Sequence, residues 1–520
     1  MKTKSFGKCV LGLGILCTSL SFASSEKRGT QSVKVRSADE DNFSLQLTPK
    51  EELALFDSKT ADALNQSWGK NRKPASEMQF DESNLSKGFV AFRNAFLSVK
   101  NAEQLEALLN TSVAQYDNYS DDVKLFVSQL QMLIPLRGVV WRMRPLFEQG
   151  GFFHGTKSSH SMAVSSIRFI ESMMKIYLPT DQWNAGFEYL TSPSAKMTNA
   201  QQFQTVRAFQ NYLLTEVRPE LEKATNQVTA IWPKSANQIY VWDLKMAYGA
   251  GTFEDGIRRY QGMASPEVEV TLGAMHSSLN NLFVFAAYNQ EKLMQVMEKV
   301  GQTIGINGFK PGAELGVTSE EEVNVLNSFG GDHFLMLRKS KTQNIGKLMM
   351  GQAFYHLQAT VNFYDLAYKQ LQKTSSSNTA MAINPIFFQE GWTKGIRDGL
   401  AKMEAMISGP AKVRSSVTGH EVTIDLPALF NNPPEQLLAF LPTGWDHQGP
   451  AEFNVKNEKG EPLTYRNYSR GRAIAWNNAA WAPYVTSAAG KDPHYMAEAA
   501  QTLFMATGGF LAFPVSFAVY

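Results

Sequence analysis

Apolar residues recur every three or four positions through most of the chain before residue 409, a spacing that places them on one face of an α-helix. The pattern predicts helices over residues 161–178, 279–300 and 345–371, and Pro179 ends the first of them. Helices of this length usually pack against one another in antiparallel pairs. The pattern therefore favours a multi-helix, bundle-like body.

Capping residues mark where several helices should begin. Thr48 precedes a proline and Glu51, which predicts a capping box and the start of ordered structure. Ser120 precedes an apolar stripe that Pro135 should kink or end. Thr198 is expected to open a further long helix.

The pattern changes near residue 409. Residues 413–417 and 421–426 predict two strands joined by a turn, and residues 453–455 and 463–465 flank a second turn. We therefore expect a small mixed region over residues 409–475.

The predicted fold class is mainly α, a bundle-like exported protein with a small α+β region. The expected divisions of the chain are a signal peptide (1–23), a flexible polar leader (24–47), a helical domain (48–408), the mixed hairpin-containing region (409–475) and an apolar helical or strand element packed on the core (476–520).

The beginning of the chain has the features of a secretory signal peptide. An apolar run over residues 9–20 follows three lysines, and small residues end at Ala23. The run is too short to span a bilayer, which needs about 20 apolar residues. We expect export to the periplasm, the outer membrane or the medium.

Cleavage there would also remove both cysteines of the chain, Cys9 and Cys17. A cysteine-free product has no disulfides, thiolate metal sites or cysteine nucleophile. The same segment carries three lysines and no acid, so cleavage lowers the formal charge from +2 to −1. Nucleic-acid binding usually needs a basic surplus, and we expect no nucleic-acid partner.

A stretch without charged residues lies between Thr502 and Tyr520. The preferred interpretation is a terminal element buried in the core. The alternative is a membrane segment, which would make the chain a membrane-associated structural protein held by this tail. Gly508, Gly509 and Pro514 weaken that alternative.

One short segment carries a resemblance to a known family. His154, Gly155 and Thr156 follow an apolar stretch and precede a predicted helix, which resembles the first motif of the ADP-ribosyltransferases. The resemblance implies that His154 contacts the nicotinamide-side ribose, with Tyr248 stacking and Glu254 as the glutamate. The resemblance rests on three residues, and the helical surroundings differ from that family's β-rich fold. A loop before a helix is the preferred interpretation.

Other short catalytic motifs are missing from the sequence. It has no Gly-x-Ser-x-Gly elbow, no His-Glu-x-x-His helix and no P-loop. His154 and His160 are six residues apart, which suits neither a helical nor a strand metal pair. We predict no metal and no cofactor. Enzymes that use a carboxylate pair leave no short motif, so a periplasmic or secreted hydrolase acting on glycan or peptide stays an alternative.

Aromatic residues gather in and after the mixed region. Trp445, Trp476 and Trp481 lie near Arg470, and exposed rings beside arginine could hold a sugar or a protein partner. Such rings more often fill a core. We expect an exported envelope or secreted protein, non-catalytic, that binds a protein or glycan partner or has a structural role. The candidate binding residues are His154, Thr156, Tyr248, Trp445, Arg470, Trp476 and Trp481.

Overall fold

The computed structural model describes residues 45–68, 80–149, 183–243, 245–248, 259–296, 299, 319–375, 393–414, 421–446, 451–456, 462–467 and 472–485. Of the interpretable residues, 68% are helical and 9% are in strands, which confirms the mainly α fold with a small β region. The expected signal peptide and the helix over residues 161–178 lie outside these ranges, as does the apolar tail.

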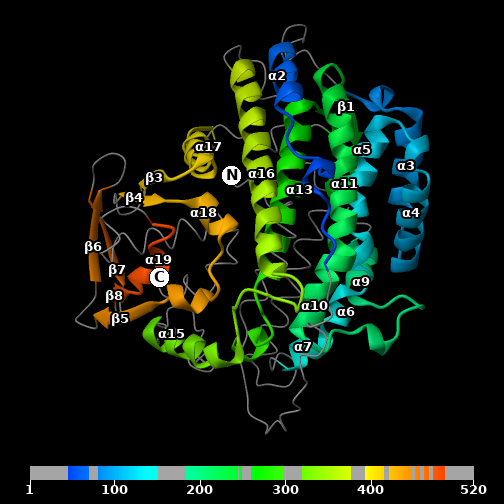
Figure 1. Ribbon diagram of the computed structural model, residues 1–520. Helices are drawn as coiled ribbons and strands as arrows, with labels where there is room; N and C mark the ends of the chain where they lie inside the picture. Colours follow the sequence, from blue (N-terminus) through cyan, green and yellow to red (C-terminus); the bar gives the residue numbers. More distant parts are fainter. Residues whose placement is uncertain are drawn as a thin grey trace.

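Two long antiparallel helices form the centre of the molecule, α13 (Ser265–Ala287) and α16 (Ile345–Ser375) (Figure 1). The predicted helix over residues 345–371 is therefore confirmed. The other helices are α2 (Ser58–Ser67), α3 (Lys87–Leu97), α4 (Ala102–Ala114), α5 (Asp121–Gln131), α6 (Val139–Arg142), α7 (Arg144–Gln149), α9 (Trp183–Thr191), α10 (Val206–Tyr212), α11 (Arg218–Ile231), α12 (Lys245–Tyr248), α15 (Ser319–Ser328), α17 (Thr393–Ser408), α18 (Leu426–Asn431) and α19 (Asn478–Trp481).

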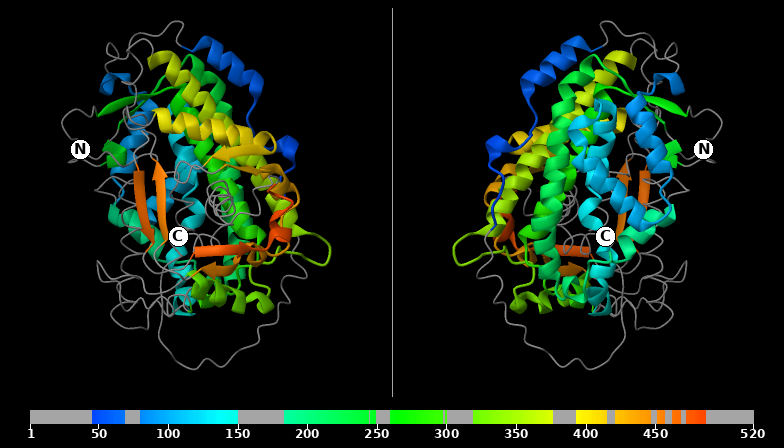
Figure 2. Two further views of the ribbon diagram at one scale, coloured as in Figure 1. Left: turned by 90° about the vertical axis from the view of Figure 1, so that its left-hand side faces the viewer. Right: turned by 90° about the vertical axis from the view of Figure 1, so that its right-hand side faces the viewer.

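The strands form four antiparallel pairs. They are β1 (Tyr240–Asp243) with β2 (Tyr260–Met263), β3 (Ala411–Arg414) with β4 (Glu421–Ile424), β5 (Pro442–Asp446) with β8 (Arg472–Trp476), and β6 (Ala451–Lys456) with β7 (Pro462–Asn467). The pairs β3–β4 and β6–β7 confirm both predicted hairpins. Figure 2 shows β5 to β8 beside the helical body, near the end of the described chain.

The helix predicted over residues 279–300 is only partly present. Helix α13 begins much earlier, at Ser265, and ends at Ala287, after which Tyr288 is extended. This helix is buried on almost every side, so it has no polar face whose periodicity would show its start. Glu267 marks the start, because its Oε2 accepts a hydrogen bond from the Ala264 N–H at 2.9 Å.

The capping box predicted at Thr48 is wrong. Lys50–Glu52 forms only a 3₁₀ turn, and the Thr48 hydroxyl donates instead to Glu222 Oε2 of α11 at 2.9 Å. A carboxylate from a distant helix competes with the local cap. The first α-helix of the described chain is α2, where the Asp57 carboxylate accepts from two main-chain N–H groups.

The helix expected from Thr198 also begins later. The Thr198 N–H donates to Gln201 Oε1 at 2.8 Å, but this half of a capping box opens only a 3₁₀ turn. The long helix starts at the Thr205 cap and runs through α10, a π-helical turn (Leu213–Val217) and α11. The start of α5 after Ser120 is confirmed, and that helix ends at Gln131, before Pro135.

The π-helical turn has a local cause. In a π turn each N–H bonds to the carbonyl five residues earlier, as the Arg218 N–H does with Leu213. The next residue, Pro219, has no N–H to give to the Leu214 carbonyl. The Arg218 side chain replaces it, with Nε 3.0 Å from that oxygen. Arg218 is thereby held in one orientation at the start of α11.

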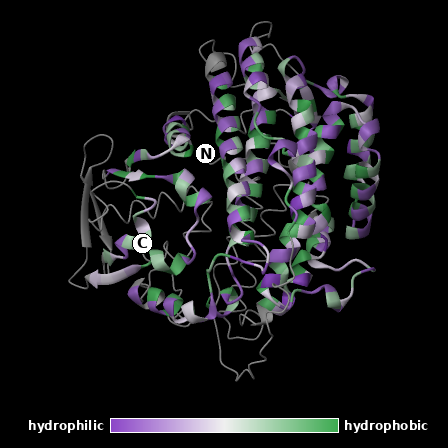
Figure 3. Cartoon of the chain, viewed as in Figure 1, coloured by the Kyte–Doolittle hydropathy of each residue, from purple (hydrophilic) through white to green (hydrophobic). Residues whose placement is uncertain are grey.

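Polar and apolar residues alternate along the helices, as Figure 3 shows, which is the pattern of amphipathic helices around a shared core. One described stretch, Asp121–Arg142, is long and apolar enough to cross a membrane by length and composition alone. In the structure 61% of its apolar window is buried within the protein, and α5 ends part-way along it. Core helices have the same composition, so this stretch is weak support for a membrane span.

Candidate functional site

Three of the residues predicted to bind a ligand lie outside the described ranges, namely His154, Thr156 and Arg470. Tyr248 is the last residue of α12, and its side chain is not among those described. The pairing of His154 with Tyr248, which the resemblance to ADP-ribosyltransferases implies, therefore stays a prediction.

The tryptophans in and after the mixed region are placed mainly in the core. Trp481 is 2% exposed and meets Phe440 edge to face, with ring centroids 4.7 Å apart. Trp476 is also buried and lies against Trp481 at 6.0 Å. Trp445 is only partly buried. Trp476 and Trp481 therefore offer no open ring face to a sugar or a partner, and Trp445 is the more accessible of the three.

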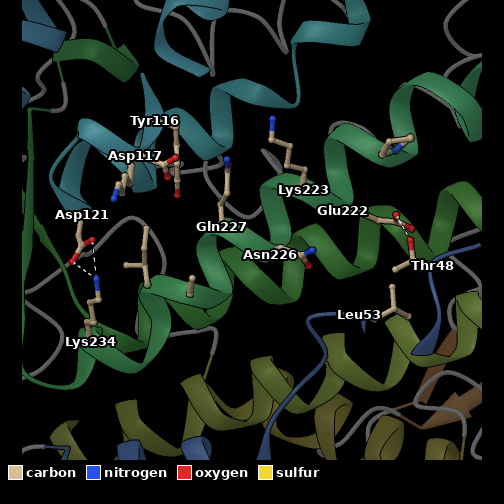
Figure 4. Close-up of a pocket in the computed structure, with 14 residues that line it drawn as sticks. Thr48, Leu53, Tyr116, Asp117, Asp121, Glu222, Lys223, Asn226, Gln227 and Lys234 are labelled. Atoms are coloured by element: carbon tan, nitrogen blue, oxygen red, sulfur yellow. Dashed lines mark hydrogen bonds and ion pairs between the residues drawn. The ribbon is translucent and has the colours of Figure 1, made fainter. Parts of the chain in front are cut away.

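A cleft of about 600 Å³ lies elsewhere, between α5 and α11 (Figure 4). One wall is made by Tyr116 and Asp117, which precede α5, and by the first turn of that helix. The polar face of α11 forms the opposite wall. Lys234 closes one end, and Thr48 with Leu53 bounds the other side.

Most charged groups of the cleft are already paired. Lys234 Nζ is 3.0 Å from the Asp121 carboxylate, and the two span the gap between the walls. Glu222 accepts from Thr48 and lies 3.3 Å from Arg218. Lys124 Nζ is 5.6 Å from the centroid of the Tyr116 ring, within cation–π range. These pairs hold the walls in place.

Four polar side chains of the lining have no hydrogen-bond, ion-pair or cation–π partner among the described residues: Asp117, Lys223, Asn226 and Gln227. Lys223 and Gln227 are four residues apart, on one face of α11, and extend toward the wall that carries Tyr116 (Figure 4). The Gln227 Oε1 atom is buried and accepts no hydrogen bond. The cleft thus keeps one anion, one cation and two amides for a bound molecule.

Tyr116 adds a neutral hydroxyl to this lining. Burial is the main cause that raises the pKa of Tyr116 above its usual value, and Asp121 and Asp117 act in the same direction. Its hydroxyl is 3.2 Å from that of Ser128, which lowers the pKa slightly. The phenol therefore keeps its proton at neutral pH.

The arrangement is suited to binding. No group of three or more His, Cys, Asp or Glu side chains in the described part of the chain could hold a metal. The carboxylates of Asp121 and Glu222 are held by cations, so neither is a free acid or base.

No protein-family model, curated protein or solved structure matches the chain. No function therefore comes to it from a relative.

Sequence reasoning missed this cleft. The spacing of polar residues predicts an amphipathic helix whose solvated face carries Lys223, Asn226 and Gln227. Most polar faces of this kind bind nothing. The cleft depends on the close approach of α5 to α11, which no local pattern shows. The only signal was the run of amides and charges at spacings of three and four along α11.

Proposed function

We propose that the protein is an exported, non-catalytic binding protein of the cell envelope or medium. Its cleft between α5 and α11 binds a small zwitterionic molecule, a free amino acid or a short peptide. The observation that carries this proposal is a set of lining side chains without a hydrogen-bond, ion-pair or cation–π partner among the described residues: the opposite charges of Asp117 and Lys223, with the amides of Asn226 and Gln227.

The amides of Asn226 and Gln227 supply hydrogen-bonding groups to a ligand in the cleft. Asp117 and Lys223 then offer a negative and a positive group for the two ends of the ligand. A neutral sugar would use the amides but leave both charges unmatched.

The pairing of the other charges supports binding over hydrolysis. A glycosidase needs two carboxyl groups free to act as acid and as base or nucleophile. Here Asp121 is tied to Lys234, and Glu222 is tied to Thr48 and Arg218. The alternative of a glycan or peptide hydrolase has no such pair in this cleft.

The ligand is tested by isothermal titration calorimetry of the full chain with amino acids, dipeptides and neutral sugars. We expect a zwitterion to bind, and both Gln227→Leu and Lys223→Met to weaken it at least tenfold. Lys59→Met, at an exposed lysine on α2, is the matched control and should leave the affinity unchanged. Gln227→Leu should not lower the melting temperature, because it removes an unmet acceptor.

Tight binding of a neutral sugar, or zwitterion binding that ignores both substitutions, would contradict the proposal. Export is tested separately by fractionating the source cells and measuring the intact mass of the product. A soluble product that begins at Ser24 supports export after cleavage. A product that resists carbonate extraction from membranes would favour the membrane-associated alternative.

A further inference from the structure

The segment over residues 45–53, here called the strap, crosses the groove between α11 and α16. Figure 1 shows it running in front of α13, from the first described residue toward α2. Phe56 fixes the chain just after the strap. Its ring centroid lies 5.1 Å from that of Phe363 and 5.8 Å from that of Trp232. The strap itself is held mainly by hydrogen bonds from side chains of the two helices.

Side chains from both helices bind the main chain of the strap. Arg218 Nη2 of α11 donates to the Gln46 carbonyl at 3.1 Å, and Gln352 Nε2 of α16 donates to the Thr48 carbonyl at 3.2 Å. The two carbonyls are two residues apart, as in recognition of an extended peptide. The groove thus binds backbone groups that any extended segment carries.

The donors of the groove are built into the helices. Arg218 is almost fully buried, and the Leu214 carbonyl and Glu222 fix its guanidinium. Glu222 in turn accepts from the Thr48 hydroxyl. A preorganised site of this kind loses little side-chain entropy when a peptide binds.

Main-chain hydrogen bonds do not tie the strap to the helical body, although its Leu45 side chain is buried in the core. None of the main-chain hydrogen bonds between described residues joins it to another element; those it makes are internal or reach only Leu55. Pro49, Lys50, Glu51 and Glu52 are exposed. The Lys50 ammonium lies 4.4 Å from the Tyr355 ring centroid on α16.

The groove is also wider than the strap. The cleft described above opens on one side, at Thr48 and Leu53. A second hollow of about 400 Å³ opens on the other side, at Leu47, with Tyr355 and Phe430 among its lining residues. An occupant with larger side chains than the strap has room on both sides.

We infer that the groove between α11 and α16 is a docking site for an extended peptide segment of a partner protein, and that the strap is its resident intramolecular occupant. The partner segment presents two carbonyls two residues apart, a hydroxyl for Glu222, a polar side chain for the cleft and an apolar side chain for the second hollow. This inference does not depend on the zwitterion proposed for the cleft.

The tether explains why a free peptide would compete poorly with the strap. A segment joined by a short linker has an effective concentration in the millimolar range. A free peptide that binds the groove as tightly as the strap does must therefore be present above that effective concentration. Otherwise the strap must be loosened first. Loosening the strap leaves every groove residue intact, which gives the experiment its design.

The test uses the full chain and a fluorescent synthetic peptide with the sequence of residues 45–53. The strap-loosened variant carries Leu45→Ala and Thr48→Val, both outside the groove helices. Fluorescence anisotropy should show the peptide binding at least tenfold more tightly to this variant than to the unchanged chain. Adding Gln352→Leu should weaken that binding at least tenfold, and a scrambled peptide is the control. Absence of binding to a folded loosened variant would overturn the inference.

Two further measurements keep the inference falsifiable if the loosened variant folds poorly. Hydrogen exchange of the unchanged chain should show strap amides exchanging much faster than those of α11 and α13. Exchange of the strap only through global unfolding would make it core and overturn the inference. A loosened variant that forms dimers by light scattering would assign the groove to a second copy of the chain and overturn the partner assignment.

Discussion

His276 of α13 and His356 of α16 lie ring against ring in the core, with their Nδ1 atoms 2.9 Å apart and both side chains buried. Each imidazole also stacks on a phenylalanine of the opposite helix, His276 on Phe363 and His356 on Phe283. The four rings form a column drawn alternately from the two helices. Burial disfavours the charged form of each ring, so both are neutral at neutral pH and one donates to the other.

The histidine pair should make the protein sensitive to acid. Burial lowers the pKa of His276 to about 3, against a small opposing effect of the Ala54 carbonyl, and burial also lowers the pKa of His356. The unfolded chain takes up protons near pH 6.5 and the folded chain does not, so stability falls as pH falls below 6.5. At pH 5 the loss relative to pH 7.5 should be about 2 kcal/mol for each histidine, measured by urea unfolding.

The control is the double variant His276→Phe with His356→Phe, which keeps four stacked rings and removes both titrating groups. Its free energy of unfolding should change less between pH 7.5 and pH 5 than that of the unchanged chain. Equal pH dependence in the two proteins would show that other groups cause the acid sensitivity.

Glu269 should make the stability of the protein depend on pH in the opposite direction. Its Oε1 accepts from Trp232, Ser265 and Gln370, but burial dominates and raises its pKa to about 8. The folded state therefore holds a proton that the unfolded state loses near pH 4.5, and stability falls as pH rises from 4.5 to 8. Glu269→Gln should lose less stability between pH 6 and pH 9 than the unchanged chain. A steeper loss in the variant would contradict a protonated Glu269.

Close packing between α13 and α16 requires glycine at position 273. A Cβ there would lie 2.8 Å from Cε1 of Tyr364, so Gly273→Ala should cost about 1–3 kcal/mol of unfolding free energy. Gly351→Ala on α16 is the control, since a Cβ there meets nothing within 4 Å. That change should leave stability equal or raise it by about 0.5–1 kcal/mol, as alanine favours helix. Chemical denaturation of both variants makes the comparison.

Trp481 should matter for stability and not for capture of a partner. Its ring is buried against Phe440 and Trp476, so Trp481→Ala should cost about 3–5 kcal/mol. Trp445→Ala is the comparison, because that ring is only partly buried and its removal should cost clearly less. Similar losses in thermal unfolding for the two variants would mean that Trp445 is also a core residue.

The sequence predicted what local spacing determines. The apolar stripe of α16 has the spacing of a helix. Each of the two hairpins has strand-like residues on both sides of a turn. The start of α13 was missed because a helix buried on all sides has no period. Thr48 was misread because the better partner for its hydroxyl, Glu222, is far along the chain.

The histidine pair and the cleft were both beyond prediction from the sequence, for the same reason. His276 and His356 are separated by 80 residues, and only the antiparallel alignment of their helices brings them together. The cleft likewise needs α5 and α11 side by side before Gln227 and Asp117 share a space. The candidates from the sequence were instead histidines and aromatic residues that lie near one another along the chain. Two of these, Trp476 and Trp481, fill the core.

The π turn before α11 fixes the phase between two parts of one helix. An additional residue in a helix advances the direction of the following side chains by about 100°. With the turn in place, Gln210 reaches the carbonyls of Phe285 and Tyr288 while Arg218 faces the strap. Relaxing Leu213–Val217 to regular α-helix without removing a residue would rotate one contact relative to the other by about 100°. At this point the length of the chain, more than the identity of any single residue, sets which faces meet.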